Sequence, residues 1–92
     1  MSDHLTPIEV AERLIGPKPE LERLAGYQPK AAYAWERSSQ SRPAGYLPVR
    51  VQLALLAHAR AHALPIDPAW LIEGAPIEAV HAALDQMRGR AA

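Results

Sequence analysis

Prolines and glycines divide this chain into helical pieces too short to build anything other than a small helical domain. The sequence has nine prolines and five glycines. A proline fits the first position of a helix, where its missing N–H leaves no hydrogen bond unmade, and a glycine fits just past the end. The pattern predicts an all-α fold of five or six short helices that begin at or next to Pro7, Pro19, Pro29, Pro48, Pro68 and Pro76.

Two helix starts carry a further signal. Thr6 and Glu9 have the spacing of a capping box around Pro7, and Gly16-Pro17 ends that first helix. Asp67-Pro68 predicts a cap for a short helix over 68–73. No alternating strand pattern occurs, and SSQSRPAGYLP (38–48) is a loop by composition.

The segment 48–63 predicts the longest central helix. Val49, Leu53 and Leu56 form a stripe at helical spacing, and we expect this stripe to face the core. Val51 and Leu55 lie on its flank. A helix that is apolar on two sides is typical of the centre of a domain.

The middle of the chain has the layout of a helix-turn-helix unit. Helices over 19–25 and 29–37 flank a turn of Gly26, Tyr27 and Gln28. Ala32 and Trp35 fall on one side of the second helix, and we expect them, with Trp70, to be packed in the core.

The opposite side of the second helix is the candidate reading surface. Cations and a tyrosine reach base edges or phosphates, and small alanines allow the helix to approach the major groove closely. With the flanking loop and the next helix start, the predicted DNA contacts are Gln28, Lys30, Ala31, Tyr33, Ala34, Arg37, Ser38, Arg42 and Arg50.

Charge is distributed in favour of this interpretation, although the formal net charge is zero. Each end of the chain, 1–17 and 63–92, is acidic by two charges. The segment 18–62 has seven cations against Glu20, Glu22 and Glu36, an excess of four positive charges. Binding to a polyanion depends on the local potential rather than on the total.

From about residue 16 to 74 the sequence resembles small bacterial and phage helix-turn-helix regulators of the lambda Cro/CI-like class. The resemblance lies in Gly26, Pro29, Tyr33-Ala34-Trp35, PVRVQLALLAHAR (48–60) and IDPAWLI (66–72). It implies a lambda-repressor-like domain and sequence-specific binding of double-stranded DNA, most simply as a repressor. Glu22 and Ala25 depart from the pattern of that class.

The last segment, 76–92, lies beyond the resemblance and follows a DNA-binding domain predicted over 1–75. Its stripe needs a cover, either on its own domain or on a second copy across a two-fold axis. We favour the homodimer, because two reading helices must be held about 34 Å apart to read a two-fold-related operator. The predicted dimer residues are Ile77, Val80, Leu84 and Met87.

Other functions have little support in the sequence. There is no cysteine, no nucleophile or paired-carboxylate motif and no phosphate-binding glycine loop, so we expect no enzyme, no cofactor and no small-molecule ligand. His58 and His62 are four apart, but no third ligand is signalled and we expect no metal. Without a signal peptide or apolar span, a cytoplasmic protein is expected. The alternative function is a protein-interaction module such as an antitoxin or anti-activator.

Overall fold

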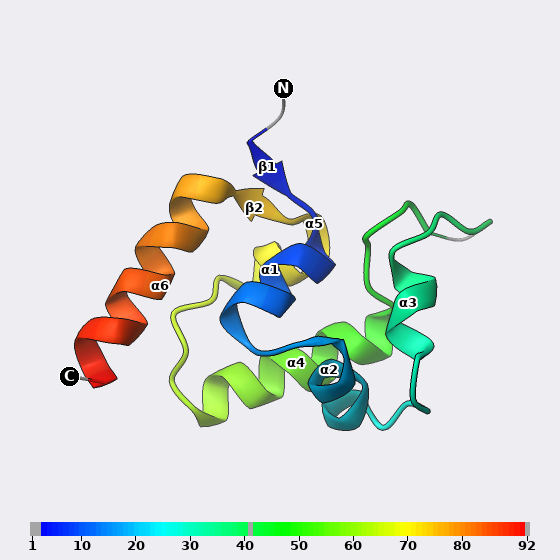
Figure 1. The fold of residues 1–92 in the computed structure, drawn as a ribbon, viewed down its shortest axis with the longest axis horizontal. Coiled ribbons are helices and arrows are strands. Elements are labelled where there is room, and N and C mark those ends of the chain that lie inside the picture. The colour runs from blue at the N-terminus through cyan, green and yellow to red at the C-terminus, as the bar shows by residue number, and fades with distance from the viewer. Residues whose placement is uncertain (1–2, 41, 92) are drawn as a thin grey trace.

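The structure is a computed structural model that describes residues 3–40 and 42–91. The described chain measures 41 × 33 × 18 Å. Figure 1 shows that the last helix lies at one end of the long axis and the third helix at the other. The elements are β1 (His4–Leu5), α1 (Pro7–Leu14), α2 (Lys18–Ala25), α3 (Ala31–Trp35), α4 (Val49–Ala61), α5 (Pro68–Glu73), β2 (Ala75–Pro76) and α6 (Ile77–Ala91).

Helix α1 begins at the predicted capping box and joins the two halves of the core. The Thr6 backbone N–H donates to the Glu9 carboxylate at 3.0 Å, and the Glu9 N–H donates to the Thr6 hydroxyl at 3.4 Å. Ile8 of α1 packs into one apolar cluster, whereas Val10 and Leu14 pack into another. Helix α1 therefore contributes to both clusters and, with the β1–β2 pair, ties α6 to the rest of the domain.

The first cluster is the core of the α1–α5 domain. Trp35 is only 3% exposed, which confirms its prediction as a core residue. It packs with residues of α1, α2, α4 and α5 and with Leu47 of the loop before α4. Trp70 is only half-buried and packs against the second cluster instead.

Helix α4 turns a different face to the core from the one that the sequence predicted. Val51 and Leu55 are fully buried, whereas Val49 and Leu53 are 67% and 64% exposed. Both stripes have helical spacing, so periodicity alone cannot choose between them. The expectation for Val49 and Leu53 was wrong, and they form an exposed apolar surface on α4.

The second cluster lies between the N-terminal elements β1 and α1 and the C-terminal elements β2 and α6. β1 and β2 pair antiparallel, with Leu5 opposite Ala75, so the all-α expectation missed a two-stranded ladder. Gly74 has a φ of 85°, a conformation that favours glycine. It also allows the two strands to approach closely, because a Cβ at this position would lie 2.0 Å from the Leu5 carbonyl oxygen. The short ladder fixes where α6 begins.

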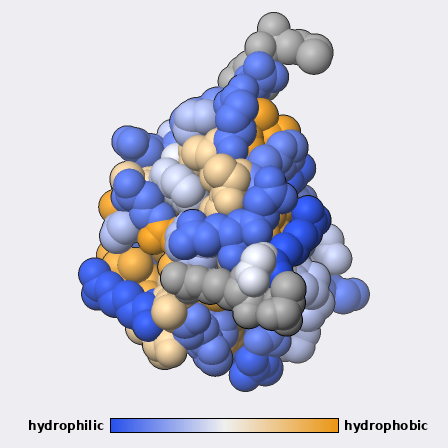
Figure 2. All heavy atoms as spheres, turned by 90° about the vertical axis from the view of Figure 1, so that its left-hand side faces the viewer, coloured by the Kyte–Doolittle hydropathy of each residue, from blue (hydrophilic) through white to orange (hydrophobic). Residues whose placement is uncertain are grey.

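Helix α6 packs on its own domain, the first of the two arrangements that the sequence allowed. Val80 is fully buried and Ala83 is 4% exposed, both in the second cluster with Val10 and Leu14 of α1. Ile77, Leu84 and Met87 are half-buried against that cluster. Figure 2, which views the molecule from the side of α6, shows mainly hydrophilic residues with separate apolar spots.

The structure holds one chain, so homodimerisation through α6 stays a prediction. Within residues 3–40 and 42–91, β2 pairs with β1 and α6 contacts α1. Among the described residues, no helix combines the length and the apolar character needed to cross a membrane. The described protein is mostly helical and compact.

Candidate nucleic-acid interface

Helices α2 and α3 form a helix–turn–helix pair around Gly26. Gly26 adopts the left-handed conformation, with φ 72° and ψ 30°, and its N–H donates to the Arg23 carbonyl oxygen. The next N–H, of Tyr27, donates to the Glu22 carbonyl oxygen at 2.9 Å. These bonds close the end of α2 and turn the chain toward α3.

Helix α3 is shorter than the 29–37 that the sequence predicted, and Pro29 does not begin it. The Ala31 N–H donates to the Gln28 carbonyl oxygen at 3.2 Å, and Lys30 has φ 73° and ψ 1°. This is the geometry of a type II turn with proline at its second position. The turn delays the helix to Ala31 and leaves Lys30 in a backbone conformation that a lysine seldom adopts.

A buried side chain of α2 caps the start of α3. The Glu22 carboxyl accepts a hydrogen bond from the Ala32 N–H at 2.9 Å, and Glu22 is 4% exposed. The N-cap residue of α3, Lys30, has no side-chain hydrogen bond to the helix. Glu22 therefore supplies from α2 the acceptor that a serine or aspartate supplies at an ordinary N-cap.

Lys18 holds the other end of α3. Its ammonium lies 2.5 Å from the Glu36 carboxylate just after α3 and 3.0 Å from the Glu12 carboxylate of α1. The same ammonium lies 5.3 Å from the centre of the Tyr33 ring. The hydrogen bonds to Glu36 and then to Glu12 raise the pKa of Lys18 above its usual range. Three elements thus meet at one cation.

Most of the predicted contact residues in and around α3 are exposed. Gln28, Lys30, Ala34 and Arg37 are exposed, as is Ser38, and Tyr33 is 52% exposed. Ala31 is half-buried. Ala32 and Trp35 are buried as predicted, so α3 has one packed face and one open face.

Arg50 and Arg42 occupy different positions. The exposed Arg50 guanidinium lies 5.4 Å from the Tyr27 ring centre, and Tyr27 packs edge-on against Trp35. This stack places Arg50 beside the turn between α2 and α3. Arg42 is half-buried in the loop, and its Nε is buried with no hydrogen-bond partner among the described residues.

The ion pairs of this region involve Lys18 and Arg23, and the candidate contact cations have no nearby carboxylate. Lys18 is paired with Glu12 and Glu36, and Arg23 with Glu20. Among the described residues, no carboxylate oxygen lies within 4.0 Å of the charged nitrogens of Lys30, Arg37, Arg42 or Arg50. Among the described residues, the cations of the middle segment without an ion pair are therefore Lys30 and Arg37 on either side of α3, Arg42 in the following loop, Arg50 at the start of α4 and Arg60 near its end.

A hollow of about 530 Å³ lies between α2 and the exposed side of α3. Its lining consists mainly of the apolar parts of two prolines and a tyrosine, together with one lysine and the buried carboxyl of Glu22. Lys30 and Tyr33 are the predicted contact residues that share it. The lining residues are Pro19, Glu22, Pro29, Lys30 and Tyr33.

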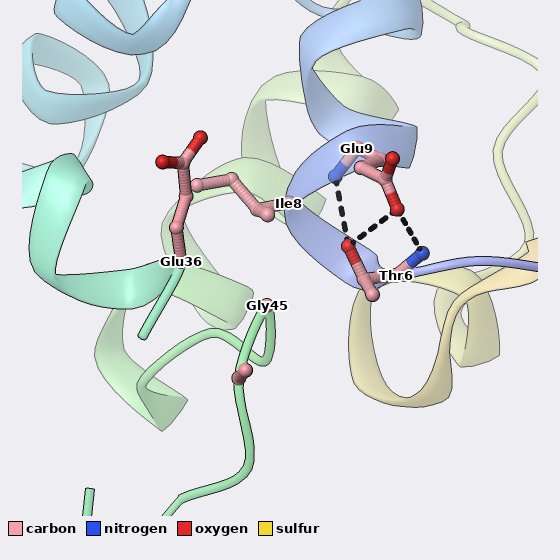
Figure 3. Close-up of a pocket in the computed structure, with 6 residues that line it drawn as sticks. Thr6, Ile8, Glu9, Glu36 and Gly45 are labelled. Carbon is pink, nitrogen blue, oxygen red and sulfur yellow. Dashed lines mark hydrogen bonds between the residues drawn. The ribbon is translucent and has the colours of Figure 1, made fainter. Parts of the chain in front are cut away.

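A second hollow, of about 250 Å³, lies between the start of α1 and the end of α3 (Figure 3). Thr6 and Glu9 line it, but they bond each other in the capping box, as the dashed lines show. Glu36 also lines it and is paired with Lys18. Its polar groups are therefore already used to hold helix ends.

His58 and His62 lie side by side on α4, with ring centres 4.3 Å apart. Burial, and then the neighbouring His62, lower the pKa of His58. No third histidine, cysteine or carboxylate completes a metal-binding group within residues 3–40 and 42–91. Two imidazoles alone are fewer than a structural zinc site uses.

Lys18 and Glu22 are the residues of this region that sequence reasoning missed. Lys18 was counted only as one cation of the basic segment, and its partners are six and eighteen positions away. Glu22 carried a signal, because it departs from the small residue expected where the two helices cross. That departure is explained by the cap on α3.

Comparisons of this chain with protein-family models, with curated proteins and with solved structures found no match. The arrangement of α2, α3 and their charges therefore stands by itself as the basis for a functional assignment.

Proposed function

We propose that this protein is a sequence-specific DNA-binding regulator that reads the major groove with the exposed side of α3. The observation that carries the proposal is the α2–turn–α3 unit with its unpaired cations. Lys30 is exposed at the N-cap of α3, Arg37 is exposed just after its end, and Arg50 lies beside the turn. The resemblance to Cro/CI-like regulators points the same way and makes a repressor the simplest form.

The rigid support of α3 favours a reading role. A side chain that identifies a base must be held in place, and α3 is held at its start by Glu22 and at its end by Lys18. Its five residues suit a short insertion that presents a few side chains. A homodimer would double these contacts on a two-fold-related site.

The test is selection of bound DNA from a random pool, followed by shift assays with the selected site. Lys30→Ala/Arg37→Ala should remove sequence preference, since each base-contacting cation provides roughly 1–3 kcal/mol of discrimination. Arg13→Ala/Arg88→Ala removes the same charge from α1 and α6 and should leave that preference intact. A folded Lys30/Arg37 variant that keeps wild-type selectivity would reject α3 as the reader.

Salt dependence separates DNA binding from the alternative of a protein partner. Each phosphate contact makes the affinity for DNA fall more steeply as the salt concentration rises. Binding through several cations should therefore weaken strongly between low and physiological salt. Failure to retain any DNA at low salt, together with a stable complex with another protein, would favour the protein-interaction module.

A further inference from the structure

In the described part of the chain, three of the four exposed large apolar side chains lie on α4 and α5, away from the predicted dimer helix. Leu53 of α4 is 64% exposed and Ile72 of α5 is 52% exposed, and Val49 lies one turn before Leu53. Clustered apolar side chains of this size on a small domain mark a contact surface more often than scattered single ones. We call Val49, Leu53, Leu56, Pro68 and Ile72 the α4–α5 surface.

The centre of the α4–α5 surface is a narrow groove without ionisable side chains. Its volume is only about 60 Å³, and Leu71, which is 1% exposed, forms part of its lining. Small-molecule sites are commonly about 300–1,000 Å³. The groove is therefore too small for a metabolite and suits the side chains of another protein surface. It is lined by Gln52, Leu53, Leu56, Pro68, Leu71 and Ile72.

Charges of opposite sign flank this neutral centre. Arg60 lies one turn beyond Leu56 on α4, and Glu73 follows Ile72 on α5. Both are exposed, and among the described residues neither side chain has an ion pair. A surface with a neutral apolar centre, one cation and one anion is complementary to a rotated copy of itself.

We propose that a second copy of this chain docks on the α4–α5 surface across a two-fold axis. Leu53 and Ile72 of each protomer fill the centre, and Arg60 of each protomer faces Glu73 of the other. The same patch serves both sides, as an isologous interface requires. A stable interface of this kind would cover about 800 Å² on each partner.

This interface replaces α6 as the site of dimerisation. Helix α6 already buries Val80 and Ala83 in its own protomer, whereas Leu53 and Ile72 are each more than half exposed. The inference supplies the dimer that the proposed DNA-binding function uses. Its test measures mass without DNA, so it fails or succeeds independently of that function.

The experiment is sedimentation equilibrium of the full chain, with circular dichroism to verify folding. The wild type should form a dimer with a dissociation constant below about 100 µM. Leu53→Glu places one negative charge from each protomer at the centre of the interface and should weaken the dimer by roughly a hundredfold or more. Ala82→Glu adds the same charge on the exposed side of α6 and should leave the dimer unchanged.

A charge exchange tests the orientation of the two copies. Arg60→Glu and Glu73→Arg should each weaken the dimer by roughly tenfold, because each change places like charges together at both ends of the interface. The variant with both changes should recover wild-type dimerisation. A general effect of net charge would not give this recovery.

Three results would overturn the inference. A wild type that stays monomeric at about 100 µM would show that this surface does not bind a second copy and would assign it to a different partner. A folded Leu53→Glu protein that dimerises normally excludes this surface. A dimer lost in Ala82→Glu but kept in Leu53→Glu assigns the interface to α6. A wild-type protein that dimerises through this surface but binds no DNA would reject the proposed function and leave the proposed interface intact.

Discussion

Helices α3 and α6 lie at opposite ends of the domain and are held in place by different physics (Figure 1). α3 has five residues and is fixed by polar contacts from α2 as well as by Trp35. α6 has fifteen residues and is fixed by an apolar stripe on α1. The first arrangement presents exposed side chains in a defined geometry, and the second closes a core.

The difference follows from length. A helix of five residues is far below the length that is stable by itself in water, so α3 forms only because its neighbours supply what it lacks. Glu22 satisfies an N–H at its start, and Lys18 compensates Glu36 at its end. At the start of α6 the Ile77 N–H donates to the Asp3 carbonyl oxygen at 2.7 Å, but along its length α6 is held mainly by Val80 and Ala83, which are buried against α1.

Ending the chain after Ala75 should have the largest effect on this comparison. The truncation uncovers Leu5, Val10 and Leu14, and full burial of such side chains is worth about 1.5–3 kcal/mol each. We expect most of the stability of so small a domain to be lost, measured by urea unfolding. A chain ending after Arg88 is the control, since nothing lies within 4 Å of where a side chain at Gly89 would begin. Near-native stability of the short chain would show that α6 is an appendage.

Trp35→Ala is the next largest change and acts on the α3 side. Trp35 is 3% exposed, and truncation of a buried aromatic to alanine costs about 3–5 kcal/mol. Trp70→Ala, at a half-buried tryptophan, should cost distinctly less. Urea midpoints of the two variants provide the measurement. Equal losses would mean that the two clusters contribute alike and that α3 is no more dependent on Trp35 than α5 is on Trp70.

The α1 and α5 starts were predictable because their signals are local. Thr6 with Glu9, and Asp67 with Pro68, specify a cap within four residues, and both caps form. The side of α3 that carries Ala32 and Trp35 was predictable for the same reason. Helix boundaries and packed faces were reliable wherever one short motif decided them.

The errors arose where the decision depends on distant residues. Pro29 suits a helix start and the second position of a type II turn equally well, and the hydrogen bond from Ala32 to Glu22 accompanies the turn. On α4 two apolar stripes compete, and only the positions of α2 and α5 select Val51 and Leu55 over Val49 and Leu53. Most of the candidate DNA contacts are exposed, although Ala31 and Arg42 are half-buried, and the support of α3 by Lys18 and Glu22 was not foreseen.

Glu22→Ala should loosen the start of α3. The change leaves the buried Ala32 N–H without its acceptor, which costs about 1–3 kcal/mol. Hydrogen exchange at Ala32 should accelerate more than exchange in α6. Glu20→Ala, two residues earlier, removes an ion pair with Arg23 and should leave Ala32 protected. Unchanged exchange at Ala32 in Glu22→Ala would show that α3 is held without this cap.

Lys18→Met should show the ionic part of the same support. The partly exposed pairs with Glu12 and Glu36 should contribute no more than about 1 kcal/mol at neutral pH, and less at high salt. The pKa of Lys18 is raised above its ordinary 10.5 in the folded state, so this contribution is complete below that pH. It is lost as pH rises through the folded-state value. The stabilities of wild type and Lys18→Met should therefore converge only in strong alkali, and convergence already near pH 8 would contradict the assignment.

Lys30→Gly should give the smallest effect and the opposite sign. Lys30 has a φ of 73°, where a side chain is strained and glycine is not, so the substitution should stabilise the fold by about 0.5–1 kcal/mol after the greater entropy of unfolded glycine is subtracted. Lys30→Ala is the matched control, because it removes the charge but keeps the strained Cβ. Higher stability of Lys30→Gly than of Lys30→Ala in urea, with similarly weak DNA binding in both, would indicate that α3 carries a strained lysine for the sake of its charge. Equal stabilities would mean that the turn holds Lys30 without strain, and the contrast with the unstrained packing of α6 would then rest on Glu22 and Lys18 alone.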